Sequence, residues 1–198
     1  MARIPASERR AALVQAALRV VATQGLAAAT TRAIVAEAGM SLASFHYAFA
    51  SRDELMHELV TFVVEHEESA VLPAPSDGAS LRDTIRAGLQ RYAELLRSDP
   101  LREQAMLELT QHALRSEGME HLARLQYQRY YALAAAALDT AAAQTHHRWT
   151  QPVDQIARLL VALTDGLTMS WLVDRDDAAA ASVMDFAADA VAQLGRPL

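Results

Sequence analysis

The chain has 198 residues, 52% of them hydrophobic, which fits one compact domain or a small module joined to a larger one, with a sizeable buried core. This composition excludes disordered, collagen-like and disulfide-framed proteins, and the lack of cysteine excludes thiol catalysis and thiolate metal sites. The net charge of −6 is uneven, because residues 1–52 hold six arginines and two acidic residues whereas residues 53–198 hold 12 arginines and 22 acidic residues.

A basic amino-terminal region on an acidic body indicates that only this region meets a polyanion. Chance clustering of arginines near the amino terminus is the alternative, in a chain that contains arginine but no lysine. The longest apolar stretch, residues 159–173, is interrupted by Asp165 and is shorter than the roughly 20 apolar residues that crossing a bilayer requires. We therefore expect a soluble protein without membrane contact, and the absence of cysteine fits the reducing cytoplasm.

Glycine, proline and aspartate clusters divide the chain into segments in which apolar residues recur at intervals of three and four, the spacing of amphipathic helices. No segment alternates with period two for long enough to predict a strand. We expect an all-α protein with about nine helices, near residues 7–24, 31–38, 42–48, 51–72, 79–98, 101–115, 117–144, 152–173 and 178–194.

The first 55 residues have the pattern of a helix-turn-helix. A long helix is expected to end at Gly25, Thr31 to cap a short second helix, and Ser41 to cap a short third helix beyond the turn at Gly39. At 1.5 Å per residue the third helix is about 10 Å long, which suits the major groove of DNA.

A longer helix follows this motif. Ser51 and Glu54 have the Ser-x-x-Glu spacing of a capping box, which predicts where this fourth helix begins. The helix is expected to be about 33 Å long and to join the amino-terminal region to the rest of the chain.

Residues 31–55 resemble the signature of the tetracycline-repressor (TetR) family, which reads roughly T-x-x-I-A-x-x-A-G-V-S-x-x-x-L-Y-x-x-F-x-S-K-x-x-L. The identities stand at Thr31, Ile34, Ala38, Gly39, Ser41, Phe49, Ser51 and Leu55, with conservative variants at Met40, Phe45 and Arg52. Val35 replaces an alanine, and His46 replaces the usual tyrosine. The resemblance implies a helix-turn-helix DNA-binding domain at residues 1–52 and a helical ligand-binding and dimerisation domain at residues 53–198.

This resemblance implies a ligand-responsive transcriptional regulator, more specifically a homodimeric repressor that binds a palindromic operator and is released by a small-molecule effector. Two alternatives stay open. One is a helical dimeric protein-interaction module without DNA binding. The other is a di-metal carboxylate enzyme, for which only Glu54 and His57 have the required Glu-x-x-His spacing. No phosphate-binding glycine loop or nucleophile motif is present, so we expect no catalytic residue, no cofactor and no metal.

The resemblance places the DNA contacts in the helix-turn-helix and at the start of the fourth helix, on Thr31, Arg32, Leu42, Ala43, Ser44, His46, Tyr47 and Arg52. The hydroxyl groups of Thr31, Ser44 and Tyr47 and the guanidinium of Arg52 can donate hydrogen bonds to phosphate oxygens. Leu42 and Ala43 can make apolar contact with a thymine methyl, and Arg32 is the first choice for a side chain that reads a base. A nearby polyanion favours the protonated form of an imidazole. If His46 contacts a phosphate, operator binding should therefore become tighter as pH falls. The alternative is that His46 is only a spacer of similar width to tyrosine.

Further basic residues precede the motif. Arg3, Arg9 and Arg10 form a basic arm that reaches phosphates or a minor groove, or else a solvated tail.

Side chains suited to a small-molecule pocket gather on the middle helices, with core packing as the alternative. They are Phe62, His66, Tyr92, Met106, Gln111, Gln126, Tyr127 and Tyr130. Apolar stripes on the last two helices predict a four-helix interface between two subunits, with burial inside one subunit as the alternative. They comprise Ile156, Leu160, Leu163, Leu167, Trp171, Val183, Phe186, Ala190 and Leu194. In such a dimer the DNA half-sites lie about 34–36 Å apart, or a multiple of that.

Overall fold

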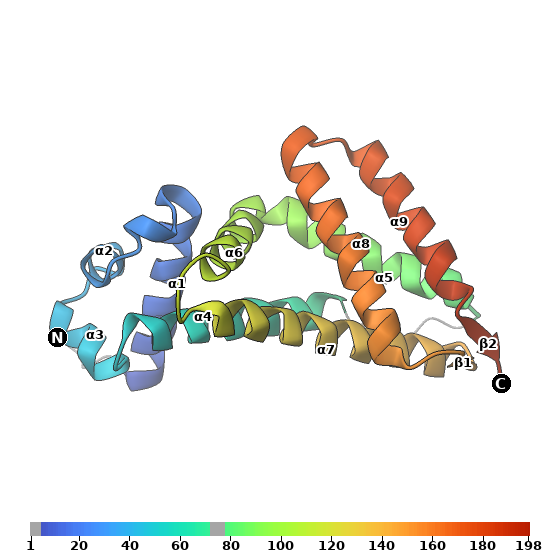
Figure 1. Ribbon diagram of the computed structural model, residues 1–198, viewed down its shortest axis with the longest axis horizontal. Helices are drawn as coiled ribbons and strands as arrows, with labels where there is room; N and C mark the ends of the chain where they lie inside the picture. The colour runs from blue at the N-terminus through green and yellow to red at the C-terminus, as the bar shows by residue number, and fades with distance from the viewer. Residues whose placement is uncertain (1–4, 72–77) are drawn as a thin grey trace. The chain divides into compact units, whose positions relative to one another are not determined.

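The computed structural model describes residues 5–71 and 78–198, with side chains described for 5–63 and 78–198 (Figure 1). The amino-terminal elements are α1 (Ala6–Gln24), the 3-10 turn η1 (Leu26–Ala28), α2 (Thr31–Glu37), α3 (Leu42–Ala48) and α4 (Arg52–Val71). They are followed by α5 (Leu81–Ser98), α6 (Pro100–Ala113), α7 (Glu120–Gln144), α8 (Val153–Asp174) and α9 (Asp177–Ala192). The expected all-α class with nine α-helices in the described part of the chain is confirmed.

Two short strands depart from the expectation of no strand. β1 (His147–Trp149) pairs antiparallel with β2 (Gly195–Pro197), and Arg148 stands opposite Arg196. Segments of three residues are too short for a period-two pattern to show in a sequence. The pairing closes the carboxyl-terminal end of the chain onto the segment between α7 and α8.

One helix cap also differs from the expectation. The N-cap of α2 is Thr30 and not Thr31: the Thr30 hydroxyl accepts a hydrogen bond from the backbone N–H of Ala33 at 3.1 Å. Ser41 caps α3 as expected and accepts from the N–H of Ser44 at 3.2 Å. Two adjacent threonines leave the position of a cap ambiguous by one residue in a sequence.

The chain divides into two compact units, which are described separately. Unit 1 comprises Met1–Val64 and Pro100–Tyr127, and unit 2 comprises Glu65–Asp99 and Gln128–Leu198. Neither unit is one continuous segment of the chain, because α6 and the start of α7 belong with the amino-terminal helices.

The core of unit 1 forms around α1. Its apolar residues recur along one face, so that Leu13, Ala17 and Val20 are buried, and α1 packs against α2, α3, η1 and α6. Phe45 of α3 and Leu55 of α4 are buried in the same core. Helix α1 thus packs against both helices of the helix-turn-helix, and α4 contributes to the same core.

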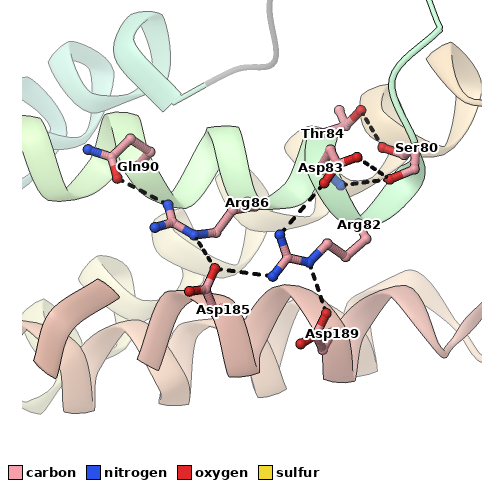
Figure 2. A network of polar contacts seen from close by, with 8 residues as sticks. All are labelled: Ser80, Arg82, Asp83, Thr84, Arg86, Gln90, Asp185 and Asp189. Atoms are coloured by element: carbon pink, nitrogen blue, oxygen red, sulfur yellow. Dashed lines mark hydrogen bonds and ion pairs between the residues drawn. The ribbon is translucent and has the colours of Figure 1, made fainter. Parts of the chain in front are cut away.

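Unit 2 contains α5, α8, α9, the two short strands and α7 from residue 128 onward. Arginines on α5 face aspartates on α9 (Figure 2): Arg86 Nε donates to Asp185 Oδ1 at 2.8 Å, and Arg82 Nε donates to Asp189 Oδ1 at 2.9 Å. These ion pairs lie at the edge of an apolar core that includes Met184.

Helix α8 has 22 residues and is apolar enough to match a membrane-spanning helix by length and composition. A third of the matching stretch is buried in the protein, including Ile156, Leu167 and Trp171. A single helix of this length and composition is weak evidence for a membrane span, and α8 packs against α9 within unit 2.

Candidate nucleic-acid interface

The turn between α2 and α3 needs glycine for its backbone conformation. Gly39 has φ +64°, which side-chain-bearing residues rarely adopt. Before it, α2 buries Ile34 and Val35, and after it Ser41 starts α3. The motif therefore has its expected short turn.

Helix α3 buries one large side chain and exposes the others. Phe45 is buried and its ring lies 5.7 Å from that of Phe49. Leu42, Ala43 and His46 are exposed, and Tyr47 is 84% exposed. A seven-residue helix that leaves a tyrosine and a leucine in solvent has a face available for a partner.

The remaining expected contacts differ in accessibility. Arg32 is exposed on α2, whereas Thr31 is half-buried. Ser44 is half-buried and its Oγ lies 3.0 Å from Oγ of Ser41, so its hydroxyl already has a partner. The polar members of the set that are exposed to solvent are therefore Arg32, His46 and Tyr47.

Arg52 has partners inside the protein. Its Nε donates to the carbonyl of Ala29 and its Nη2 to that of Leu26, both at 2.7 Å. Burial lowers the pKa of Arg52, and the nearby Asp53 carboxylate opposes this shift. The guanidinium thus bonds one carbonyl at the start of η1 and one directly after it, and these bonds hold it inside unit 1.

Arg10 also points inward and is not part of a free basic arm. Its Nη1 and Nη2 donate to the carboxylates of Glu54 and Glu58, each at 3.1 Å, and Nη1 also bonds the carbonyl of Ala48. The guanidinium lies 4.2 Å from the ring centroid of Phe49. Burial alone would lower the pKa of Arg10, but the hydrogen bonds of the two glutamates raise it. Arg3 lies outside the described residues.

The expected capping box at the start of α4 is present in an altered form. The N–H of Glu54 donates to Ser51 Oγ at 3.0 Å, as expected. The Glu54 carboxylate accepts from the N–H of Ala50 at 2.7 Å, one residue earlier than the standard partner. This bond and those of Arg10 lower the pKa of Glu54.

The expected effector residues of unit 1 fall into three groups. Met106 and Gln126 are buried, and Gln126 is bound to its own unit: its Oε1 accepts from Thr110 Oγ1 at 2.8 Å and its Nε2 donates to the Met106 carbonyl at 3.3 Å. Gln111 is exposed on α6. Phe62 and Tyr127 are half-buried, and Phe62 packs against the core of unit 1. Packing explains Met106 and Gln126 without a ligand.

In unit 2, Tyr92 and Tyr130 are half-buried, and the Tyr92 hydroxyl hydrogen-bonds Thr168 Oγ1. His66 lies in the part of α4 whose side chains are outside the described residues. The role of these three residues in ligand binding stays a prediction.

Most residues of the stripes expected to form a dimer interface pack against the core of unit 2. Ile156, Leu167 and Trp171 are buried, and four more members pack partly buried against the same core: Leu160, Leu163, Val183 and Leu194. Ala190 is half-buried, and Phe186 is 63% exposed. The alternative of burial within one subunit therefore holds for most of the α8 stripe, since α8 turns this face toward α5 and α9.

A different face of α8 is apolar and exposed. It consists of Leu159, Ala162, Gly166, Met169 and Val173. The members alternate spacings of three and four, the pattern by which one helix packs along another. We call this the α8 outer stripe.

Two family descriptions match the chain. Residues 13–59 match "Bacterial regulatory proteins, tetR family", and residues 79–196 match "BetI-type transcriptional repressor, C-terminal". The first match includes the helix-turn-helix, and the second includes more than half of the chain.

Three relatives illustrate the similarity. The nicotine-responsive transcriptional repressor HdnoR of Paenarthrobacter nicotinovorans is 30% identical over 179 residues, which cover 88% of this chain and 89% of that protein. The multidrug-binding protein EbrR, solved with imidazole, is 28% identical with a TM-score of 0.64, over 96% of each chain. A TetR-family regulator from Rhodococcus sp. is 22% identical with a TM-score of 0.73, over 93% of this chain and 99% of that one. The chain belongs to the TetR family and is a ligand-responsive, DNA-binding transcriptional regulator of the repressor type.

Proposed function

We propose that the protein represses transcription in the cytoplasm as a homodimer that binds an inverted-repeat operator through residues 1–52. Each subunit places α3 in the major groove of one half-site, with Leu42, Ala43, His46 and Tyr47 facing the DNA and Arg32 of α2 beside them. The observation that carries this proposal is the 84% exposure of Tyr47 on a helix whose Phe45 is buried. The residues act by binding and not by catalysis.

The test of the DNA face compares two exposed arginines. Duplexes selected from a random pool serve as ligands, and affinity is measured against salt concentration. Arg32→Ala should weaken binding by about 1–3 kcal/mol if Arg32 reads a base. Arg124→Ala removes the same charge from an exposed position on α7 and should leave affinity unchanged. Equal affinities for the two variants would remove Arg32 from the interface.

We place dimerisation and effector binding in residues 53–198. The α8 outer stripe, together with the exposed Phe186 of α9, supports a helix-to-helix contact between two subunits. A stripe of this kind in a lone subunit would leave apolar area in water. Two-fold symmetry then presents two copies of α3 to one side of the DNA.

The effector we propose is a small nitrogen-containing organic cation. One relative is described as nicotine-responsive, and EbrR was solved with imidazole and with ethidium. Residues 53–198 carry 22 acidic residues against 12 arginines, and such a charge attracts cations. Aromatic faces bind cations directly, and Phe62 and Tyr127 are half-buried aromatic residues of unit 1.

Binding is measured without DNA, because ethidium itself intercalates between base pairs. Titration should show saturable binding of ethidium, and nicotine should compete with ethidium for the same site. In a separate experiment without ethidium, nicotine should release the selected duplex from the protein. Tyr127→Leu should weaken binding by about 1 kcal/mol through loss of the aromatic face, whereas Tyr127→Phe should retain it. Unchanged binding in Tyr127→Leu would exclude this residue from the ligand site.

A further inference from the structure

Three side chains with metal-binding groups meet in unit 1, although they come from distant parts of the sequence. Asp53 and His57 stand four residues apart on α4, so their side chains lie on one face of that helix. His121 stands in the first turn of α7. One ligand atom from each residue lies within 4.8 Å of the other two. We propose that this cluster binds a divalent transition-metal ion, with Zn²⁺ as the first candidate.

The orientation of His121 supports this proposal. Its Nδ1 lies 2.8 Å from the carbonyl oxygen of Gly118. A carbonyl only accepts hydrogen bonds, so Nδ1 carries the proton and Nε2 faces the carboxylate of Asp53. A backbone carbonyl on the outer ring nitrogen is the usual support of a metal-binding histidine, because it selects the tautomer and holds the ring.

The distances also fit a tetrahedral ion. Two ligands of such an ion, each bound at about 2.0–2.1 Å, stand about 3.3 Å apart. His121 Nε2 and Asp53 Oδ2 are separated by 3.3 Å. The His57 ring stacks on that of His121 with centroids 4.8 Å apart, and one His57 nitrogen lies within 4.8 Å of the other two ligand atoms, so the His57 side chain must shift toward the ion on binding.

The cluster is open to solvent, with side-chain exposures of 34% for His121 and 49% for Asp53. An ion can therefore enter, and water can supply the fourth ligand. Two imidazoles and one carboxylate suit Zn²⁺, Co²⁺, Ni²⁺ or Cu²⁺, whereas Mg²⁺ and Ca²⁺ prefer oxygen ligands throughout. The neighbouring carboxylates of Glu54 and Glu58 are bound to Arg10, which leaves Asp53 as the acidic ligand.

Metal binding would link the first turn of α4 to the first turn of α7 inside unit 1. Helix α4 directly follows α3 in the chain, so the ion would stabilise the unit that carries the exposed face of α3. This inference does not depend on operator binding and is tested without DNA.

The experiment uses the full chain without a histidine tag, after removal of bound metal with a chelator. Co²⁺ is titrated while visible absorption is recorded, and Zn²⁺ is titrated by calorimetry. One ion should bind each chain. His57→Asn and His121→Asn should each weaken binding at least about tenfold, since loss of even outer-shell partners costs 10–100-fold. Zn²⁺ at 100 times its dissociation constant should raise the melting temperature by roughly 5–10 °C.

His147→Asn is the control, because this residue lies outside the cluster, and this variant should bind the metal ion as tightly as the wild type. Asp53→Asn tests the cluster without changing a histidine and should also weaken binding. Circular dichroism checks that each variant is folded. Absence of binding in the wild type, or loss of binding in His147→Asn instead of His121→Asn, would overturn the proposal and leave Asp53 and His121 as an ordinary ion pair.

Discussion

The carboxylate of Glu108 on α6 accepts a hydrogen bond from the backbone N–H of Leu26, with Oε1 and N separated by 2.6 Å. Leu26 begins η1, whose backbone oxygens are held from the other side by Arg52. The turn between α1 and α2 is therefore fixed at its N–H by α6 and at its carbonyls by α4. Unit 1 includes α6 for this reason as well as for the packing of α6 on α1.

We expect Glu108→Ala to lower the free energy of unfolding by about 1–2 kcal/mol, because the N–H of Leu26 loses a charged acceptor. Glu108→Gln keeps an acceptor at the same place and should lose less. Urea denaturation followed by circular dichroism measures both values. Equal stabilities for wild type and Glu108→Ala would mean that water replaces the carboxylate at no cost.

Gly25 provides a second test of the same contact. Its φ is +84°, and an added Cβ would lie 2.9 Å from Glu108 Oε1. With ψ at 159° this backbone conformation is essentially restricted to glycine, so Gly25→Ala should destabilise the protein by about 1–3 kcal/mol from the backbone alone, with a steric contribution added. In Gly25→Ala/Glu108→Ala the steric contribution disappears, so the double variant should be less destabilised than the sum of the two single variants.

Arg10 should affect stability more than DNA contact. Arg10→Gln removes the positively charged guanidinium that bonds two glutamates and a carbonyl, and we expect the free energy of unfolding to fall by about 1 kcal/mol, discounted because the side chain is partly exposed. The slope of operator affinity against salt concentration should stay as in the wild type. Arg32→Ala should do the reverse, with an unchanged melting temperature and an operator affinity weakened by about 1–3 kcal/mol.

Local signals made the helices predictable from the sequence. Ser41 caps α3 and Gly39 forms the turn before it, because caps and turns depend on residues within three or four positions. The inward positions of Arg10 and Arg52 were not predictable in this way. Their partners lie 23 to 48 residues away in the chain, and a count of charges shows the clustering of arginines but not what each one binds.

Two features of the candidate sites were missed for the same reason. Helix α8 has apolar residues on more than one face, so its periodicity could not show that Leu167 faces the core and Met169 the solvent. His121 is far from Asp53 and His57 in sequence, and no spacing rule connects them. The separation of four between Asp53 and His57 was the one local signal of that cluster.

Stability should depend on acidic pH through Asp185. Hydrogen bonds from Arg86 first, and then Arg82, lower the pKa of Asp185 below its usual value. Its contribution to stability is therefore full above the unfolded-state pKa of about 3.9 and is lost as pH falls through the lower folded-state value. Asp185→Asn should be less stable than the wild type at pH 6, and the difference should shrink below about pH 4.

Thermal melts of the two proteins between about pH 2.5 and 6 measure this difference. Asp139→Asn is the control, since Asp139 is exposed on α7. A constant gap between wild type and Asp185→Asn over the whole range would mean that the ion pairs with Arg82 and Arg86 do not contribute to folding.

The α8 outer stripe should control the oligomeric state. Met169→Glu places a charge in the middle of the stripe, and burying it without a partner should raise the dimer dissociation constant at least about a hundredfold, or roughly 3 kcal/mol. Sedimentation equilibrium gives the mass of each species. Ala136→Glu adds the same charge at an exposed position of α7 and should remain dimeric.

Operator binding separates dimer loss from unfolding in this experiment. Met169 is exposed, so Met169→Glu should keep the helical content and melting behaviour of a folded subunit. Its affinity for a full inverted repeat should fall to that for a single half-site, because the second α3 is no longer held at the spacing of one helical turn of DNA. If Met169→Glu stays dimeric and binds the full repeat like the wild type, the subunits must associate through a different surface.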